Sequence, residues 1–264
     1  MIKAFLLVAF VCIAGFSFLY FGQEKLIFYP ERLPENYRYN FPGNFQELMW
    51  DVDGAKINAL HFRVNHPQGV ILYFHGNAGS LRGWGDVAGE FTGRGYDILI
   101  PDYRGFGKST GKIKNESMLL EDAAFAYRYL QKHYQENEIV IFGRSIGSGL
   151  AVYLAKSSKP RMLILESPFF SLRDVAKYHY PFLPAGFFDW TLRYPMRSDL
   201  WIQGSACPIY LIHGTEDEVV PYSSSVKLLN LINAQGTLVT IEGGGHNNLS
   251  DFRLYQEQLD KILK

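Results

Sequence analysis

The sequence predicts an α/β fold in which a mostly parallel central sheet carries helices on both faces and is preceded by an antiparallel hairpin. Short apolar runs alternate with helix-like segments along most of the chain. The runs are apolar throughout and do not alternate with polar residues, which is typical of strands that helices cover on both faces. With 264 residues, 47% of them hydrophobic, the chain is long enough for one large domain.

The hairpin is predicted first along the chain. Residues 45–51 and 56–64 are strand-like and flank Asp53-Gly54, a dipeptide that favours a hairpin turn. Parallel strands are expected in the apolar runs 70–74, 96–100, 139–142, 162–165, 209–212 and 238–241. Helices are expected near residues 82–93, 117–134, 146–157, 221–233 and 249–263.

Charge and cysteine content argue against several functions. The 26 basic residues balance the 26 acidic ones, so the chain lacks the positive field that nucleic-acid binding requires, and we expect no nucleic-acid partner. Cys12 and Cys207 lie far apart, and neither belongs to a C-x-x-C pair. We therefore expect no disulfide and no metal site.

The N-terminal residues differ from the rest of the chain. Residues 4–22 form an uncharged run dominated by Phe, Leu, Val, Ile and Ala. As a helix, this run would span ~28 Å, close to the ~30 Å hydrocarbon core of a bilayer. We predict a single-pass membrane anchor over residues 1–22. Two alternatives stay open: a buried core helix, and a signal peptide cleaved near Gly15 and Ser17, which would give a secreted or periplasmic protein.

A connector is predicted to join the anchor to the domain. Residues 23–44 combine Pro30, Pro34 and Pro42 with mixed charges, a composition typical of irregular structure. The α/β domain is expected to occupy residues 45–264.

Residues 172–206 interrupt the alternation of strands and helices and predict a small cap inserted between two strands. The aromatic residues of this insertion are Tyr178, Tyr180, Phe182, Phe187, Phe188, Trp190, Tyr194 and Trp201. A cap of this composition over an active site would bury an acyl chain and exclude water. Its rings would also suit a bilayer interface. The alternative is that these aromatic residues pack as ordinary core.

A G-x-S-x-G pattern, Gly143 to Gly147, follows the apolar run that ends at Phe142 and leads directly into a predicted helix. In this strand-turn-helix context the pattern predicts that Ser145 is a nucleophile on a sharp turn. The turn brings backbone segments together, so the flanking positions must lack side chains. The helix dipole favours negative charge at the serine. The alternative is a Gly-Ser helix cap without chemistry.

A serine hydroxyl needs a base that removes its proton, and the base needs an acid that fixes its tautomer. Asp217 and His246 follow the ends of the last two predicted strands, and we predict that they are the acid and the base. Glu216 and Glu218 are expected to be solvated. Other roles are expected for most of the remaining histidines, polar or loop-orienting for His61, His66, His75, His133 and His213, whereas His179 in the cap stays open as a rival base.

Acyl transfer builds negative charge on a carbonyl oxygen, and each backbone N–H group aimed at that oxygen can contribute ~3 kcal/mol. His75-Gly76-Asn77-Ala78-Gly79 follows a predicted strand, and its small residues would let the backbone approach a substrate. We predict an oxyanion hole formed by the amides of Asn77 and Ile146. An ordinary glycine-rich turn is the alternative.

Together these residues resemble the α/β-hydrolase superfamily. The motifs that carry the resemblance are His75 to Gly79, Asp102 to Ser109, Gly143 to Gly147, Asp217 and His246. Their chain order of serine, acid and histidine is that of the α/β-hydrolase fold. Over about residues 25–262 the chain is similar, more narrowly, to membrane-anchored α/β-hydrolase-domain proteins, a group related to depalmitoylases, lysophospholipid lipases and serine-aminopeptidase-like enzymes.

The resemblance implies that the segment from Asp102 to Ser109 is mainly architectural, which places Asp102 and Arg104 outside the catalytic set. The chain departs from the eukaryotic depalmitoylases, which carry a cysteine cluster near the N-terminus. Here only Cys12 lies in that region. The specific substrate of those enzymes therefore does not carry over.

We expect a serine hydrolase that cleaves an ester or thioester with an apolar acyl group through an acyl-enzyme, without a cofactor. The expected partners are a small or lipid-like acyl substrate and, through the N-terminal segment, a membrane. His246 must be neutral to accept a proton, so activity should decline below roughly pH 6 to 7. A serine peptidase of the same fold and a non-catalytic membrane-tethered scaffold are the alternatives.

Overall fold

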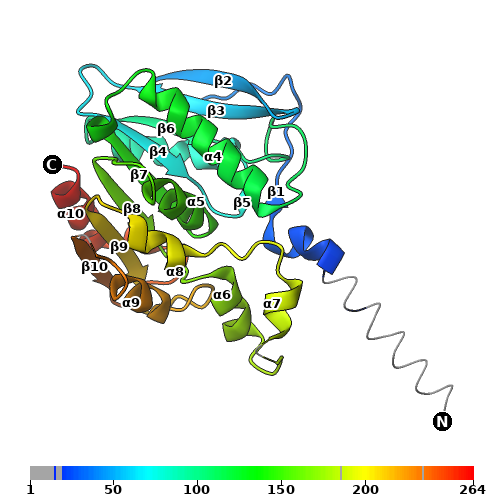
Figure 1. The fold of residues 1–264 in the computed structure, drawn as a ribbon. Helices are drawn as coiled ribbons and strands as arrows, with labels where there is room; N and C mark the ends of the chain where they lie inside the picture. The colour runs from blue at the N-terminus through cyan, green and yellow to red at the C-terminus, as the bar shows by residue number, and fades with distance from the viewer. Residues whose placement is uncertain (1–14, 16–19, 185, 234) are drawn as a thin grey trace, which may run out of the picture.

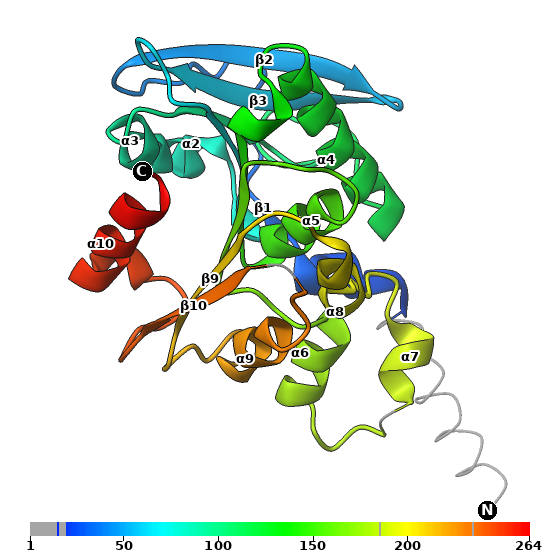
Figure 2. The ribbon, with the colours of Figure 1, turned by 60° about the vertical axis from the view of Figure 1, so that its left-hand side comes forward.

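The computed structural model describes residues 15, 20–184, 186–233 and 235–264. An eight-stranded sheet in the order β10-β9-β8-β7-β4-β6-β3-β2 runs through the molecule (Figures 1 and 2). Its strands are β2 (Asn44–Val52), β3 (Ala55–Arg63), β4 (Val70–Phe74), β6 (Asp97–Pro101), β7 (Ile139–Arg144), β8 (Met162–Glu166), β9 (Ile209–Gly214) and β10 (Gly236–Ile241). β2 and β3 are antiparallel, and β3 is antiparallel to β6, whereas the pairs from β6 through β10 are parallel. The predicted fold class is confirmed.

Helices cover both faces of the sheet (Figure 2). They are α2 (Leu81–Trp84), α3 (Ala88–Thr92), α4 (Glu116–Gln131), α5 (Ile146–Ala155), α9 (Ser223–Leu229) and α10 (Arg253–Ile262). Buried residues of α4, α5 and α9 form one hydrophobic core with the sheet, and those of α2, α3 and α10 form a second core on the opposite face. Every residue of β4, β6 and β8 is buried, which explains why these strands read as continuous apolar runs.

The helix expected near residues 82–93 is broken into three pieces. α2 and α3 are separated by a 3-10 turn, Gly85–Val87. A Cβ atom at Gly85 would lie 2.2 Å from the ring of Phe41, so the chain passes too close to that ring for any other residue. Glycine also has a low helix propensity, and Gly83 and Gly89 add to the break.

The segment expected as an irregular connector is partly regular and packs on the domain. Residues 20–27 are helical, and this segment is called helix 20–27 below. It is followed by β1 (Tyr29–Pro30), which pairs with β5 (Ala78–Gly79). Phe28 is buried, with its ring edge-on to Phe106 and Tyr194. A two-residue strand has no periodic pattern that the sequence could show.

The insertion at residues 172–206 forms the predicted cap. It contains α6 (Leu172–His179), α7 (Phe187–Thr191) and α8 (Ser198–Trp201), which are drawn in yellow-green and yellow in Figure 1. Its aromatic residues divide into two groups. Tyr194 is fully buried, as the core alternative expected, whereas Phe182 and Trp190 are 78% and 83% exposed.

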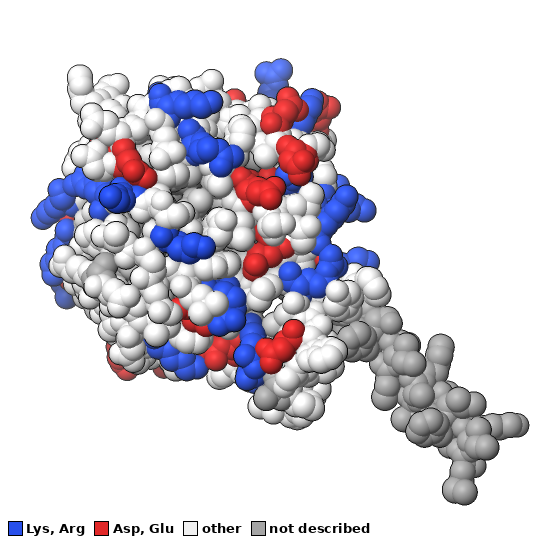
Figure 3. All heavy atoms as spheres, in the orientation of Figure 1, with Lys and Arg blue, Asp and Glu red and all other residues white. Residues whose placement is uncertain are grey.

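On the face of the molecule shown in Figure 3, basic and acidic side chains are interspersed and are separated by broad uncharged areas. The predicted anchor falls largely on residues that lie outside the described part of the chain. Among the residues that the structure does describe, no helix combines the length and the apolar content needed to cross a membrane.

Candidate active site

Ser145 occupies the sharp turn between β7 and α5. Its backbone angles are φ 52° and ψ −119°, a left-handed conformation that costs a non-glycine residue about 1–3 kcal/mol. A Cβ atom at Gly143 would lie 2.6 Å from the Gly147 carbonyl, and one at Gly147 would lie 2.2 Å from the Phe74 carbonyl. The two flanking glycines are thus required by close backbone approach, as the pattern predicted.

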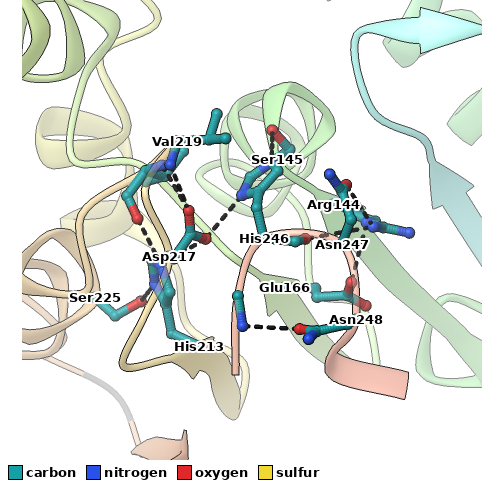
Figure 4. A network of polar contacts seen from close by, with 12 residues as sticks. Arg144, Ser145, Glu166, His213, Asp217, Val219, Ser225, His246, Asn247 and Asn248 are labelled. Atoms are coloured by element: carbon teal, nitrogen blue, oxygen red, sulfur yellow. Dashed lines mark hydrogen bonds and ion pairs between the residues drawn. The ribbon is translucent and has the colours of Figure 1, made fainter. Parts of the chain in front are cut away.

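The structure brings Ser145, His246 and Asp217 together from three strand ends (Figure 4). His246 Nε2 lies 3.0 Å from Ser145 Oγ, and His246 Nδ1 lies 2.7 Å from Asp217 Oδ2. The ionised carboxylate can only accept a hydrogen bond, so Nδ1 carries the ring proton. In the neutral imidazole, Nε2 is then the acceptor nitrogen, and it faces the serine hydroxyl. This is the tautomer that a general base for Ser145 must have.

The Asp217 carboxylate is buried but well supplied with donors. Its Oδ1 accepts hydrogen bonds from the backbone N–H groups of Val219 at 2.9 Å and Val220 at 2.8 Å. Burial alone raises the pKa of Asp217, but hydrogen bonds from His213 and His246 outweigh burial and hold that pKa well below its ordinary value. These hydrogen bonds therefore favour the ionised form of Asp217.

His213 is a member of this network, whereas the sequence predicted only a loop-orienting role for it. Its Nε2 lies 3.0 Å from the Val220 carbonyl and 3.2 Å from Asp217 Oδ2. Because both neighbours are acceptors, Nε2 carries the hydrogen, and Nδ1 accepts from the Ser225 hydroxyl at 2.7 Å. His213 is fully buried. Its hydrogen bonds hold the loop that carries Asp217 and Val220 in place.

Arg144, the residue before the serine, holds the loop that carries His246. Its guanidinium pairs with Glu166 at 3.0 Å and donates to Asn247 Oδ1 at 3.1 Å (Figure 4). Asn248 Oδ1 accepts from the Gly245 N–H at 2.8 Å and tightens the same loop. The variable position of the G-x-S-x-G pattern carries no specific signal, so this contact was not predictable from the sequence.

Asn77 and Ile146, the predicted oxyanion residues, line a cavity of about 200 Å³ together with Ser145. Within the described part of the chain, neither backbone N–H group meets an acceptor. The Asn77 side chain points elsewhere, since its amide donates to the Ile27 carbonyl at 2.7 Å. The N-terminal segment therefore supports the loop after β4.

The remaining motif residues lie beneath this loop. His75 Nε2 lies 3.2 Å from Asp102 Oδ1, and both side chains are fully buried. The Tyr103 hydroxyl donates to the His75 carbonyl at 2.6 Å. Arg104 pairs with Asp122 of α4 at 2.7 Å. These contacts hold loops in place and do not include Ser145.

Two other histidines, His61 and His179, lie in surroundings that differ from those of His246. His61 lies buried in β3, where burial, followed by the charge of Arg63, lowers its pKa to about 3. His179 lies at the end of α6, and its Nε2 donates to the Val219 carbonyl at 2.9 Å. It lines the Ser145 cavity but is no part of the Ser145–His246–Asp217 relay. In the described residues, no group of three or more His, Cys, Asp or Glu side chains could hold a metal ion.

Comparison with known families identifies the protein. A family model described as "Serine aminopeptidase, S33" matches residues 65–198, slightly more than half of the chain. The chain belongs to this family of α/β-hydrolases. The range matched to the family includes Asn77 and Ser145 and ends before Asp217 and His246. The protein is thus an α/β-hydrolase enzyme, as the motifs predicted.

Proteins of similar sequence differ in how much of their length aligns with this hydrolase. It is 31% identical over 268 residues to an uncharacterized protein of Mycobacterium tuberculosis, covering 97% of this chain and 92% of that protein. It is 35% identical over 191 residues to the lysophosphatidylserine lipase ABHD12 of Danio rerio, covering 64% of this chain and 48% of the lipase. The hydrolase therefore spans about half the length of that lipase.

Solved structures share the fold of this hydrolase at low sequence identity. A Pyrococcus furiosus esterase superposes with a TM-score of 0.69 at 17% identity, covering 89% of this chain and 98% of the esterase. The thioesterase domain from the curacin biosynthetic pathway superposes with a TM-score of 0.58 at 18% identity, covering 84% of this chain and 99% of that domain. At these identities the likeness concerns the fold alone.

Proposed function

We propose that this serine hydrolase cleaves carboxylic esters or thioesters that carry an apolar acyl group. The observation that carries the proposal is the placing of the Ser145 hydroxyl, 3.0 Å from His246 Nε2, in a cavity whose walls are mostly apolar. The apolar wall residues are Leu26, Ile27, Ile146, Phe169, Leu172, Val175, Val219 and Val220. An acyl chain can enter such a cavity without leaving a polar group unpaired.

The proposed mechanism uses these residues in turn. Ser145 Oγ attacks the acyl carbon while His246 Nε2 takes the hydroxyl proton, and Asp217 stabilises the resulting imidazolium. The amides of Asn77 and Ile146 hold the negative oxygen of the tetrahedral intermediate. His246 then returns the proton to the leaving oxygen or sulfur. Water repeats the sequence on the acyl-enzyme and releases the carboxylic acid, so no cofactor is needed.

The names of similar proteins support acyl-transfer chemistry. A lysophosphatidylserine lipase, an esterase and a thioesterase domain appear among them. The named lipase is similar over only part of its length, so its particular substrate is not transferred. What these proteins have in common, attack on an acyl carbon, agrees with the residues around Ser145.

An aminopeptidase activity, which the family description names, has weaker support. Capture of a peptide amino terminus calls for a carboxylate close to the nucleophile, because the ammonium group must be paired when it leaves water. No acidic residue lines the cavity that contains Ser145 in the described structure. Comparing nitrophenyl esters with aminoacyl anilides separates the two activities, and we expect turnover of the esters only.

The decisive experiment is labelling with a fluorophosphonate, which reacts only with an activated serine. Wild-type protein should be labelled, and Ser145→Ala should be unlabelled and reduce ester hydrolysis by a factor of ~10⁴ or more. Ser148→Ala is a matched control, because Ser148 is a buried serine of α5, the helix that follows Ser145. Equal labelling of wild type and Ser145→Ala would refute the proposed mechanism. An unlabelled but correctly folded wild-type protein would favour the scaffold alternative.

We also propose that residues 1–22 anchor the enzyme to a membrane. The support is the uncharged apolar run at residues 4–22, which as a helix would nearly match the ~30 Å hydrocarbon core of a bilayer. The full chain should stay with membranes after carbonate extraction. N-terminal sequencing should find an uncleaved chain, and a start near Ser17 would instead establish a signal peptide.

A further inference from the structure

A second and larger apolar chamber lies beside the cavity that contains Ser145. Its volume is about 530 Å³, it is bordered by helix 20–27 on one side and by α6 and α7 of the cap on the other, and it is open to solvent beside the exposed rings of Tyr180 and Phe182. In Figures 1 and 2 the blue helix 20–27 lies next to α7. The volume falls within the ~300–1,000 Å³ range of small-molecule sites.

The chamber and the Ser145 cavity are neighbours with shared walls. The residues that line both are Leu26, Ile27, Leu172, Val175 and His179. The outer walls of the chamber are also apolar, with Ala176, Phe182, Leu183, Phe187, Phe188 and Leu192 among them. The two cavities therefore share an apolar border, and the chamber extends the apolar surroundings beyond the cavity that contains Ser145.

We propose that this chamber binds the distal part of a long acyl chain and that helix 20–27 is its specificity-determining wall. The substrates would then be long-chain acyl esters or thioesters, and short acyl groups would fill only the Ser145 cavity. The proposal rests on the proposed ester hydrolysis, which places the acyl carbon at Ser145. It goes further in assigning the chain-length preference to residues that precede the predicted domain.

The wall is fixed to the cap by polar contacts. Gln23 Nε2 donates to the Thr191 carbonyl at 2.9 Å, and Gln23 Oε1 accepts from the Arg193 N–H at 2.8 Å. Glu24 pairs with the Arg193 guanidinium at 2.8 Å and accepts from the Tyr194 hydroxyl at 2.8 Å. Helix 20–27 thus has a defined position against the cap, which a selective wall requires.

Filling the chamber tests the proposal in the full-length protein. Ala176 lines the chamber but not the Ser145 cavity, so Ala176→Trp should obstruct long chains before short ones. We expect the ratio of kcat/KM for nitrophenyl palmitate to that for nitrophenyl butyrate to fall about tenfold or more, since even single methylenes in apolar pockets change rates by ~10–200-fold. Lys177→Trp, one residue further along α6 and outside both linings, is the matched control and should leave the ratio unchanged.

A second variant tests the wall itself. Gln23→Ala removes two of the four polar contacts described above between helix 20–27 and the cap, so it should also lower the palmitate-to-butyrate ratio. Lys25→Ala, an exposed residue of the same helix, is its control. An unchanged ratio in both Ala176→Trp and Gln23→Ala would overturn the proposal, as would an equal loss on both esters.

Binding of palmitic acid to the Ser145→Ala protein separates the two proposals. Calorimetry should detect binding, and Ala176→Trp in the same background should abolish it. Absence of binding would overturn the chamber proposal, even if the wild-type protein hydrolyses butyrate and the proposed function stands. Binding without hydrolysis of either ester by the wild-type protein would support the chamber and overturn the proposed function.

Discussion

His213 Nε2 lies 3.2 Å from Oδ2 of Asp217, the same oxygen that faces His246 Nδ1 at 2.7 Å. One carboxylate oxygen is therefore shared by two imidazoles, one buried behind the site and one facing the nucleophile. The second oxygen is held by two backbone N–H groups. The direction in which Asp217 presents its charge to His246 is fixed before any substrate binds, which is the kind of preorganisation that lowers the barrier to proton transfer.

Replacing His213 should reduce turnover without changing substrate affinity. His213→Phe removes one hydrogen bond to the charged Asp217, and such bonds contribute ~1.5–3 kcal/mol, so we expect kcat to fall about 10–100-fold. KM should stay the same, because His213 lines neither the cavity nor the chamber. His213→Gln, whose amide can donate to Asp217, should recover part of the loss. A change in KM with an unchanged kcat would contradict this positioning role.

Arg144 should contribute to both stability and activity. Arg144→Met leaves Glu166 buried without its cation, and breaking a buried pair in this way costs roughly 3–5 kcal/mol. The free energy of unfolding, measured in urea, should fall by an amount near this range. The double variant Arg144→Met with Glu166→Gln should restore much of the stability. It should not restore kcat, because the contact between Arg144 and Asn247 that holds the His246 loop is still absent.

Gly147→Ala tests the close approach of α5 to the loop after β4. The added Cβ atom would lie 2.2 Å from the Phe74 carbonyl and 2.7 Å from the His75 carbonyl. We expect a loss of about 1–3 kcal/mol in stability, typical of overpacking, with reduced hydrolysis because the loop that carries Asn77 must move. The matched control is Gly89→Ala in α3, where nothing lies within 4 Å of the new atom. That substitution should be neutral or slightly stabilising.

His61 should make the stability of the protein depend on pH. Burial lowers the pKa of His61 to about 3 in the folded protein, whereas the unfolded chain has the ordinary histidine value of ~6.5. Between these values the unfolded state binds more protons, so the free energy of unfolding should fall as the pH is lowered from about 6.5. The slope attributable to one proton is at most ~1.4 kcal/mol per pH unit.

Urea unfolding of the full chain between pH 6.5 and pH 4 measures this slope, and His61→Phe should reduce it. The comparison of slopes is independent of how far the substitution changes stability at neutral pH. His66→Asn is the control, because His66 is exposed and its replacement should leave the slope unchanged. Equal slopes in wild type and His61→Phe would show that another group causes the acid sensitivity.

The parts of the site that the sequence predicted share a physical origin. Ser145 and Asp217 follow the buried strands β7 and β9, His246 follows the partly exposed edge strand β10, and the carboxyl ends of parallel strands meet at one edge of a sheet. Apolar runs locate those ends, so the three residues could be chosen without coordinates, and the structure places them within hydrogen-bonding distance. Their catalytic roles stay predictions until the labelling and kinetic tests are made.

The parts that the sequence could not predict depend on contacts between distant segments. His213 looks like any histidine at a strand end, and only the path of the following loop brings it to Asp217. Arg144 occupies a position at which the motif accepts any residue. The docking of helix 20–27 rests on side-chain hydrogen bonds to residues about 170 positions away, for which local periodicity gives no signal.

Asn77 bonds the segment around Ile27 and Tyr29 to the loop that would cradle the oxyanion. Its side-chain amide donates to the Ile27 carbonyl at 2.7 Å, and its own carbonyl accepts from the Tyr29 N–H at 2.8 Å. Shortening the protein so that it starts after Pro30 would remove this support together with the predicted membrane anchor. Poor catalysis by such a trimmed enzyme would then report damage to the reaction centre, and not a need for the lipid bilayer.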